Sequence, residues 1–180
     1  MATSLHATDF GRTATPQQIE EVVRFFREKP FMRIAGAGAT TTALPAAIPL
    51  MRVVIESLKR RIVEVAKYQP FMSISVIFEG NQRADRDLQA YFGDVRFRVD
   101  GHKVPTNCYL MPKSANEPAL EVVDFVANAV GGHARRTLVQ KRDGFGQDFK
   151  AVFHGIDRRL VSFMGIERVE INSPANAEAK

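Results

Sequence analysis

Met72-Ser-Ile-Ser-Val-Ile-Phe78 is the clearest strand in the chain. Polar and apolar residues alternate at its start and its end is continuously apolar, a pattern typical of a central strand covered on both faces. A long helix is expected before it, over roughly Pro49 to Lys67. Its buried side would consist of apolar residues at helical spacing, namely Leu50, Val54, Leu58, Ile62 and Val65. A helix followed by a buried strand favours an α/β sheet covered by helices.

On the N-terminal side of this unit, the polar residues 1–14 are expected to form a loop or a loosely held arm. The helix after this arm has a strong start at Thr15-Pro16-Gln17-Gln18, with threonine as the cap, proline in the first turn and Gln18 at the capping-box position. Met32-Arg33-Ile34-Ala35 indicates the entry of a strand. The next segment, Gly36 to Thr42, is conformationally permissive and fits either a strand or a loop.

On the C-terminal side, the pattern predicts a short helix over Asp85 to Phe92 and a strand over Val95 to Val99. Asp100-Gly101 is a signal for a hairpin turn. A last hairpin is expected from Phe149 to His154 and from Leu160 to Ile171. This order of elements predicts one domain over residues 15–172 and a frayed tail over residues 173–180.

The composition is that of an ordinary globular protein: 180 residues, 45% hydrophobic and 25% charged. A net charge of +5 weakly favours a phosphate-bearing partner such as nucleic acid. Cys108 is the only cysteine, which excludes an internal disulfide and favours a reducing, cytoplasmic compartment. No apolar run approaches the ~18 residues that span a bilayer, and the N-terminus lacks the pattern of a signal peptide, so no membrane association is expected.

Lys113 to Gly132 is expected to contain one helix that carries acid beside its buried face. Ser114 or Asn116 would cap its start, and Gly131-Gly132 would end it. The expected buried stripe consists of Leu120, Val123, Ala127 and Val130.

Asp124 lies directly beside this stripe, and Glu121 and Asn128 share its face of the helix. A carboxylate at the edge of an apolar surface is costly unless it meets a cation, a metal or hydrogen-bond donors. Asp124 is therefore the first candidate for chemistry.

Glu79 is the second candidate, because it ends the clearest strand and α/β sheets bind ligands beyond the carboxyl ends of their strands. If that strand packs beside the acidic helix, Glu79 and Asp124, with Glu121, would face one crevice. Such carboxylates suit Mg²⁺ or Mn²⁺, which take oxygen ligands and bridge to substrate phosphates. The alternative is that Glu79 merely opens a loop and that Asp124 pairs with an arginine.

Four basic residues are candidates for contacts with phosphate: Lys113, Arg83, Arg135 and Arg136. Lys113 precedes the acidic helix, whereas the two later arginines come after His133 in an expected surface cluster. Solvation of a surface loop would explain each of these charges equally well.

Three segments carry a family resemblance: Thr15 to Phe26 with Phe31-Met32-Arg33-Ile34, Val76-Ile77-Phe78-Glu79 with Asn81 to Asp85, and Lys113 to Leu120 with Val123-Asp124-Phe125. Together they resemble a bacterial and phage family of RNase H-like proteins known as domain of unknown function thirty-eight hundred. The resemblance implies a mixed sheet flanked by helices, with an acidic centre for a divalent metal. In that pattern Glu79 would be the acid of a central strand and Asp124 the acid of a late helix.

The chain departs from the family at its start. Family members open with a strand that bears Asp-Glu-Ser, and no Asp-Glu-Ser occurs in this sequence. Asp9 lies in a threonine-rich stretch without strand character and is a poor substitute. The resemblance therefore implies an RNase H-like sheet that lacks its first strands and holds metal weakly.

The sequence supports three hypotheses of function. The first is a metal-dependent nuclease that uses Mg²⁺ or Mn²⁺ at Glu79 and Asp124. The second is a non-catalytic binding or assembly module, of phage or mobile-element origin, that forms a homo-oligomer through an exposed sheet edge. The third is simple nucleic-acid binding through Arg135-Arg136, Lys141 and Arg142.

Overall fold

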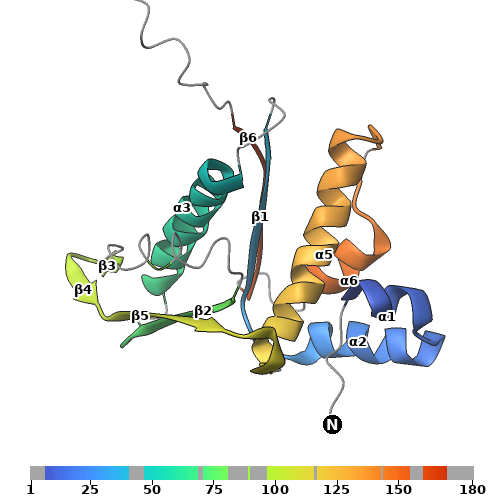
Figure 1. Cartoon of the computed structure of the whole chain (residues 1–180), viewed down its shortest axis with the longest axis horizontal. Helices are drawn as coiled ribbons and strands as arrows, with labels where there is room; N and C mark the ends of the chain where they lie inside the picture. The colour runs from blue at the N-terminus through green and yellow to red at the C-terminus, as the bar shows by residue number, and fades with distance from the viewer. Residues whose placement is uncertain are drawn as a thin grey trace, which may run out of the picture.

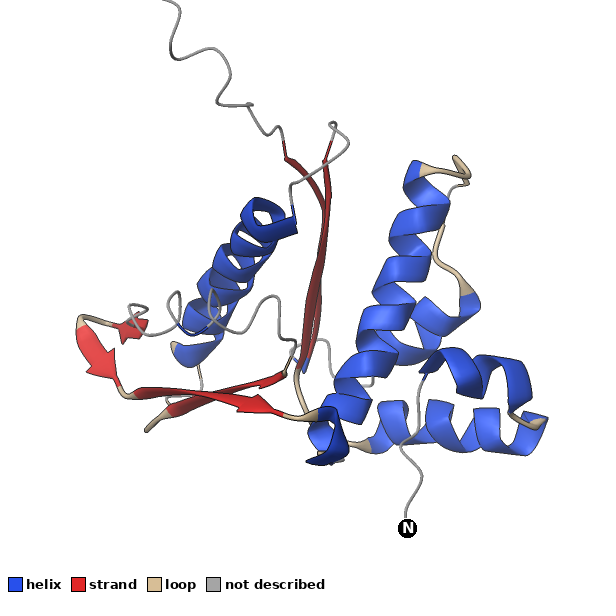
Figure 2. Ribbon diagram, in the orientation of Figure 1, coloured by secondary structure: helices blue, strands red, loops and turns tan. Residues whose placement is uncertain are grey.

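The protein is a mixed α/β structure in which helices lie on both sides of a central pair of strands (Figures 1 and 2). The computed structural model describes residues 7–40, 47–68, 71–80, 89, 97–115, 117–142, 144–154 and 160–169. The described elements are, in chain order, α1 (Ala7–Thr13), α2 (Pro16–Glu28), β1 (Arg33–Thr40), α3 (Ala47–Ala66), β2 (Ile74–Glu79), β3 (Phe97–Val99), β4 (His102–Val104), β5 (Thr106–Met111), the 3-10 turn η1 (Lys113–Ala115), α5 (Pro118–Leu138), α6 (Gln147–Phe153) and β6 (Val161–Val169).

The central layer is the parallel pair of β1 and β6, which joins residues far apart in the sequence. Helix α3 contacts this pair on one face, and α5 and α6 contact it on the other (Figure 1). Of the segment from Gly36 to Thr42, which fits either a strand or a loop, the residues up to Thr40 belong to β1, and Thr41 and Thr42 lie outside the described residues. In the described residues the strands form three separate pairs, so a mixed α/β class is confirmed, whereas an RNase H-like sheet stays a prediction.

An irregularity interrupts the pairing of β1 with β6. Ala35 pairs with Phe163 and Ala37 with Ile166, so two residues of β6 oppose Gly36 alone. One of them, Gly165, has φ of 92°, a conformation that favours glycine. A Cβ atom added at Gly36 would lie 2.9 Å from Met164 Cε, the end of a flexible side chain that would have to shift to admit it.

Two smaller pairs complete the strands. β2 pairs with β5 in parallel, and β3 pairs with β4 in a hairpin. At the tip of the hairpin, Asp100 has φ of 49° and Gly101 has φ of 82°. Positive φ at both positions is the signature of a type I′ turn, so the turn predicted from Asp100-Gly101 is confirmed.

The helices α2 and α3 also agree with their sequence signals. Thr15 Oγ1 accepts a hydrogen bond from Gln18 N–H, and the Gln18 side chain accepts one from Thr15 N–H, which completes the expected capping box. Helix α3, at Ala47–Ala66, matches the long helix predicted over Pro49 to Lys67. The short helix predicted over Asp85 to Phe92 lies outside the described residues, apart from Gln89.

The buried side chains form two clusters. The larger lies between β1, α2, α5 and α6, and its buried members are Phe26, Ala35, Ala129, Val130, Phe149, Val152 and Phe153. The smaller is built on Phe97 and Val104, with side chains of α3, β2 and β5 packed against it. Cys108 packs here too, as expected of a small apolar residue, and burial raises the pKa of its thiol.

β2 is covered on one face only, which corrects the expectation of burial on both faces. Ile74, Val76 and Phe78 are partly buried against the smaller cluster. Ser75, Ile77 and Glu79 are exposed on the opposite face. The continuous apolar run at the end of the strand therefore does not mean that both faces are buried, because Ile77 of that run is exposed to solvent.

Arg33 is a buried charge at the start of β1, where 4% of its surface is exposed. Its Nη1 donates a hydrogen bond of 2.6 Å to the Phe26 carbonyl near the end of α2, and its guanidinium lies 5.2 Å from the ring centre of Phe31. A cation at a helix C-terminus is favoured by the helix dipole. Burial lowers the pKa of this guanidinium below its ordinary value.

Three expectations about the extent of helices are also wrong. Residues 7–13 of the expected N-terminal loop form α1, and Phe149–Phe153 belongs to helix α6 instead of a hairpin strand. Helix α5 continues through Gly131 and Gly132 to Leu138. Each interior glycine disfavours a helix by about 1 kcal/mol relative to alanine, and the packing of Val130 and His133 on either side compensates.

The start and the buried face of α5 also differ from expectation. Glu117 caps the helix, with its carboxylate accepting from Ala119 N–H at 3.5 Å, whereas Ser114 lies in the preceding 3-10 turn and Asn116 lies outside the described residues. Val123 and Ala127 of the expected stripe are exposed. The buried face is rotated toward Ala129, Val130 and His133, because α2, β1 and α6 meet the helix on that side.

Candidate functional site

The carboxyl ends of β2 and β5 lie beside the start of α5 (Figure 1). Glu79, the last residue of β2, pairs with Met111, the last residue of β5. Gly80 N–H continues the pairing with a hydrogen bond of 2.7 Å to the Met111 carbonyl. The chain then passes through η1 into α5, which contacts β2. This is the end of a parallel pair at which α/β proteins commonly bind ligands.

The candidate acids at this end differ in their surroundings. Glu79 is exposed, and Glu121 is partly buried in the first turn of α5, where the helix dipole favours a negative charge. Asp124, one turn further along the same face, is partly buried. The helix face shared by Glu121, Asp124 and Asn128 thus starts near the carboxyl ends of the parallel strands.

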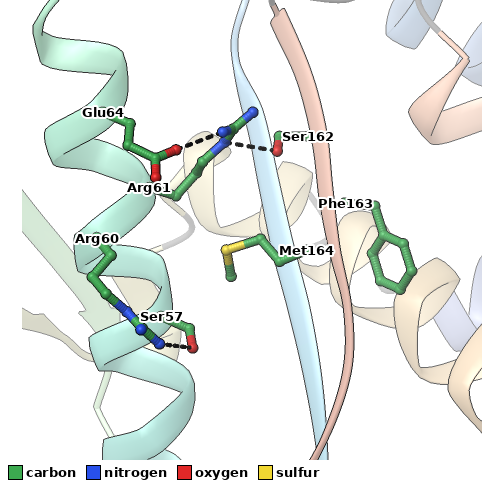
Figure 3. A pocket seen from close by; sticks show the side chains of 7 residues that line it. All are labelled: Ser57, Arg60, Arg61, Glu64, Ser162, Phe163 and Met164. Carbon is green, nitrogen blue, oxygen red and sulfur yellow. Dashed lines mark hydrogen bonds and ion pairs between the residues drawn. The ribbon is translucent and has the colours of Figure 1, made fainter.

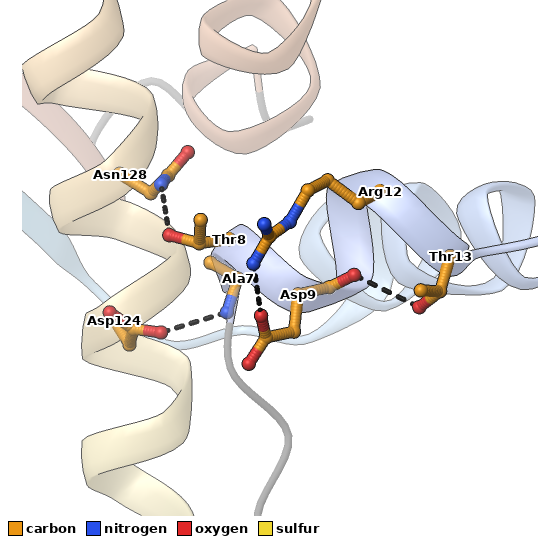
Figure 4. A network of polar contacts seen from close by, with 7 residues as sticks. All are labelled: Ala7, Thr8, Asp9, Arg12, Thr13, Asp124 and Asn128. Atoms are coloured by element: carbon orange, nitrogen blue, oxygen red, sulfur yellow. Dashed lines mark hydrogen bonds and ion pairs between the residues drawn. The ribbon is translucent and has the colours of Figure 1, made fainter.

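Asp124 holds the start of α1 (Figure 4). Its Oδ2 accepts a hydrogen bond of 2.8 Å from the backbone N–H of Ala7, the first residue of that helix. One turn further along α5, Asn128 Nδ2 donates to Thr8 Oγ1 at 3.4 Å. From the sequence, Asp124 is expected to meet a cation, a metal or a hydrogen-bond donor, and the Ala7 amide is such a donor. The first backbone amides of a helix have no partner within it, so the contact also satisfies a group of α1.

Glu79, Glu121 and Asp124, the predicted metal ligands, all lie among the described residues. Among the described residues, no three side chains of His, Cys, Asp or Glu form a group that could hold a metal ion. The predicted set of Glu79, Glu121 and Asp124 is therefore not brought together as a three-ligand site. Each of these carboxylates offers the hard oxygen ligands that Mg²⁺ and Mn²⁺ prefer, and Asp124 is turned toward α1 (Figure 4).

Of the basic residues predicted to contact phosphate, Arg135 and Arg136 are described by the structure, and they lie far from the acids. Arg135 and Arg136 lie in the last turn of α5, and a separation of eleven residues places Arg135 roughly 17 Å along the helix axis from Asp124. Arg135 is exposed, whereas Arg136 is partly buried over Gly146. Arg83 and the side chain of Lys113 lie outside the described residues.

His133 does not belong to a surface cluster, because it lies in the interior of α5 with 8% of its surface exposed. Its ring packs among three aromatic rings, with centres 4.7 Å from Phe145, 4.6 Å from Phe149 and 5.2 Å from Phe163. Burial, and secondarily the positive charge of Arg136, lower the pKa of His133 below its ordinary value. The surroundings therefore favour the neutral imidazole, and the side chain packs as part of the core. This packing was not predicted from the sequence, because the helix was expected to end at Gly131-Gly132.

Comparison with known proteins does not extend these observations. No family model matches the chain, and neither a curated protein nor a solved structure matches it. The resemblance to the RNase H-like family therefore stays a prediction based on its three short motifs. Within the part of the chain that the structure describes, no helix is both long and apolar enough to cross a membrane.

Proposed function

We propose that the chain is an RNase H-like domain that hydrolyses phosphodiester bonds with Mg²⁺ or Mn²⁺ bound by Glu79 and Asp124. The observation that supports this proposal is the meeting of the carboxyl ends of β2 and β5 with the start of α5. Two of the three segments that resemble the family lie here: Val76 to Glu79 belongs to β2, and Val123-Asp124-Phe125 belongs to α5.

In this proposal the protein's own groups bind and orient. Glu79 supplies an exposed carboxylate, which is accessible to a large substrate, and Asp124 supplies one whose direction is restrained by Ala7 N–H. A carboxylate has two oxygens with about four lone-pair sites, so a hydrogen bond to one oxygen is compatible with a metal contact. A bound divalent ion would stabilise the negative charge that develops on the phosphate and lower the pKa of an attacking water.

The proposal predicts Mn²⁺-dependent cleavage that depends on the charge of Asp124. We expect the wild-type protein to cleave DNA or RNA in Mn²⁺ but not in EDTA, and Asp124→Asn to reduce the rate at least ~100-fold, the scale of losing one group that stabilises transition-state charge. Asparagine keeps an oxygen that can accept from Ala7 N–H, so the fold is preserved. Gel assays on single-stranded and duplex substrates, with thermal unfolding of each variant, make the measurement.

Two further variants separate catalysis from folding. Asp124→Ala removes the acceptor as well as the charge, and we expect it to lower the free energy of unfolding by about 1–2 kcal/mol. Asp9→Asn removes an exposed carboxylate that pairs with Arg12 at 2.6 Å, and it should retain full cleavage. If the wild-type protein shows neither cleavage nor a change in melting temperature with Mn²⁺, the nuclease proposal is wrong.

A second candidate function, assembly of identical chains, is favoured by the outward face of the β2–β5 pair. Ile77 and Tyr109 are cross-strand neighbours there, and they are 37% and 49% exposed. Ile77 and Tyr109 form a small apolar patch on this face beside the exposed Ser75, Glu79 and Asn107, and covering such a patch with a further sheet stabilises a two-stranded pair. The occupant in this proposal is the same face of a second copy, because each side offers the partner an aromatic and an aliphatic side chain.

This candidate predicts a dimer that one charge on the face disrupts. In light scattering, we expect the wild-type protein to have twice the monomer mass and Tyr109→Lys to be monomeric, because burying an unpaired ammonium is strongly unfavourable. Val139→Lys is the matched control, since Val139 is 72% exposed at the far end of α5. A monomeric wild-type protein, or equal masses for both variants, would exclude this mode of assembly.

A further inference from the structure

A polar cavity of about 370 Å³ lies between α3 and β6 (Figure 3). Helix α3 contributes Ser57, Arg60, Arg61 and Glu64, and β6 contributes Ser162, Phe163 and Met164. Helix α3 packs on the face of the β1–β6 pair opposite to α5 (Figure 1). The cavity is therefore separate from the acidic end at which α5 begins, and it does not depend on the proposed function.

Arg61 spans the cavity from helix to strand. Its Nε donates a hydrogen bond of 3.0 Å to Ser162 Oγ, and its Nη1 lies 2.6 Å from a carboxylate oxygen of Glu64 (Figure 3). These contacts fix the plane of the guanidinium, which has five N–H groups in all. The contact with Ser162, which a ligand at the Glu64 position need not displace, orients the guanidinium before any ligand arrives.

Arg60 is the second cation at this cavity. Its Nη2 donates to Ser57 Oγ at 3.2 Å, and only 5% of the surface of Ser57 is exposed. A nearly buried hydroxyl thus anchors an otherwise exposed arginine on the same wall of α3 (Figure 3). The spacing of three residues between Ser57 and Arg60 places both on one side of the helix.

The charges at the cavity favour an anion. The lining carries two guanidinium groups and one carboxylate, and the side chain of that carboxylate, Glu64, is 57% exposed. An exposed pair between residues three apart on a helix contributes roughly 0–1 kcal/mol, so an anionic ligand can replace Glu64 at Arg61 with little loss. Guanidinium groups bind phosphate oxygens in a bidentate manner, and serine hydroxyls can donate to the same oxygens. A volume of about 370 Å³ is large enough for a phosphate group with a small organic substituent.

We propose that this cavity is a binding site for a phosphate group, held by Arg60 and Arg61 with the hydroxyls of Ser57 and Ser162. The ligand class is a phosphate ester, carried either by a small molecule or by a nucleic-acid backbone. Both sources present the same tetrahedral oxyanion to the two arginines, and they differ in the number of ester bonds and in the groups that these bonds attach to the phosphate.

Isothermal titration calorimetry with three probes tests the proposal: inorganic phosphate, a nucleoside 5′-monophosphate, and a short single-stranded oligonucleotide without a terminal phosphate. We expect at least one probe to bind, with an affinity that falls at least tenfold in Arg61→Gln and further in the double variant Arg60→Gln/Arg61→Gln. Arg61→Lys should weaken binding less, since lysine keeps the charge but not the bidentate geometry. Binding of the first two probes identifies a small-molecule ligand, and binding of the oligonucleotide alone identifies a backbone phosphate.

The control is Arg24→Gln, which removes one exposed positive charge from α2 and should leave the affinity unchanged. Circular dichroism of each variant verifies that the fold is retained. Absence of heat with all three probes would overturn the proposal, as would equal affinities of the wild-type protein and the double variant. Neither result would affect the nuclease proposal, whose readout is cleavage that depends on Asp124.

Discussion

Replacing Phe26 with alanine is expected to lower the free energy of unfolding by about 4 kcal/mol, within the range measured for large buried aromatic residues. Phe26 is 2% exposed and lies in the larger core cluster, where α2, β1 and α5 meet. Its ring centre is 5.9 Å from that of Phe31 and 6.3 Å from that of Phe125. Deleting the ring removes apolar burial and leaves a cavity that the rigid elements around it cannot fill.

This loss is large relative to the total free energy of unfolding, which is about 5–15 kcal/mol for a typical domain. Chemical denaturation with matched m-values makes the measurement. The control is Phe25→Ala, since Phe25 is the neighbouring residue of the same type and is 36% exposed. We expect a loss of about 1 kcal/mol there. Similar losses for the two variants would contradict the position of the core given by the structure.

Acidification is expected to destabilise the protein through His133. The folded state lowers the pKa of this imidazole below the ordinary value of 6.5, so the unfolded chain binds its proton at a higher pH than the folded chain. The contribution of His133 is therefore complete above pH 6.5 and is lost as the pH falls below it. The cause is physical: a charged ring cannot be solvated among Phe145, Phe149 and Phe163, and Arg136 repels it.

The measurement is the melting temperature from pH 8 to pH 5 for the wild-type protein and for His133→Leu, whose side chain is apolar and of similar size. We expect the variant to have the flatter profile. His102→Gln and His154→Gln are the controls, because both histidines are exposed, and their profiles should match that of the wild type. If His133→Leu keeps the wild-type slope, the imidazole is not the group that links stability to pH.

Local signals were sufficient for several elements. The capping box at Thr15, the periodicity of α3 and the turn at Asp100-Gly101 each depend on interactions within a few residues, and all three are confirmed. Helix α6 was missed for the converse reason. It has only seven residues, and the aromatic pair Phe149 and Phe153 fits equally well in a strand until the cluster that buries one face is known.

The extent and rotation of α5 depend on tertiary contacts that no local pattern carries. Gly131 and Gly132 are ordinary signals for a helix end, but the packing of His133 among three aromatic rings maintains the helix beyond them. The partial burial of Asp124 was predictable from its place beside apolar residues. Its partner was not, because Ala7 is 117 positions away in the sequence and lies in a segment without a recognisable pattern.

The pairing of β1 with β6 has a consequence for biosynthesis. Arg33 and Val161 are register partners, so the ribosome must add well over a hundred residues between the two halves of this pair. Until then the nascent β1 lacks its hydrogen-bonding neighbour, and closing so long a loop delays folding and prolongs exposure to aggregation. Chains that stop before residue 161 should therefore depend on chaperones, whereas loss of the short β3–β4 hairpin removes only a contact between nearby residues.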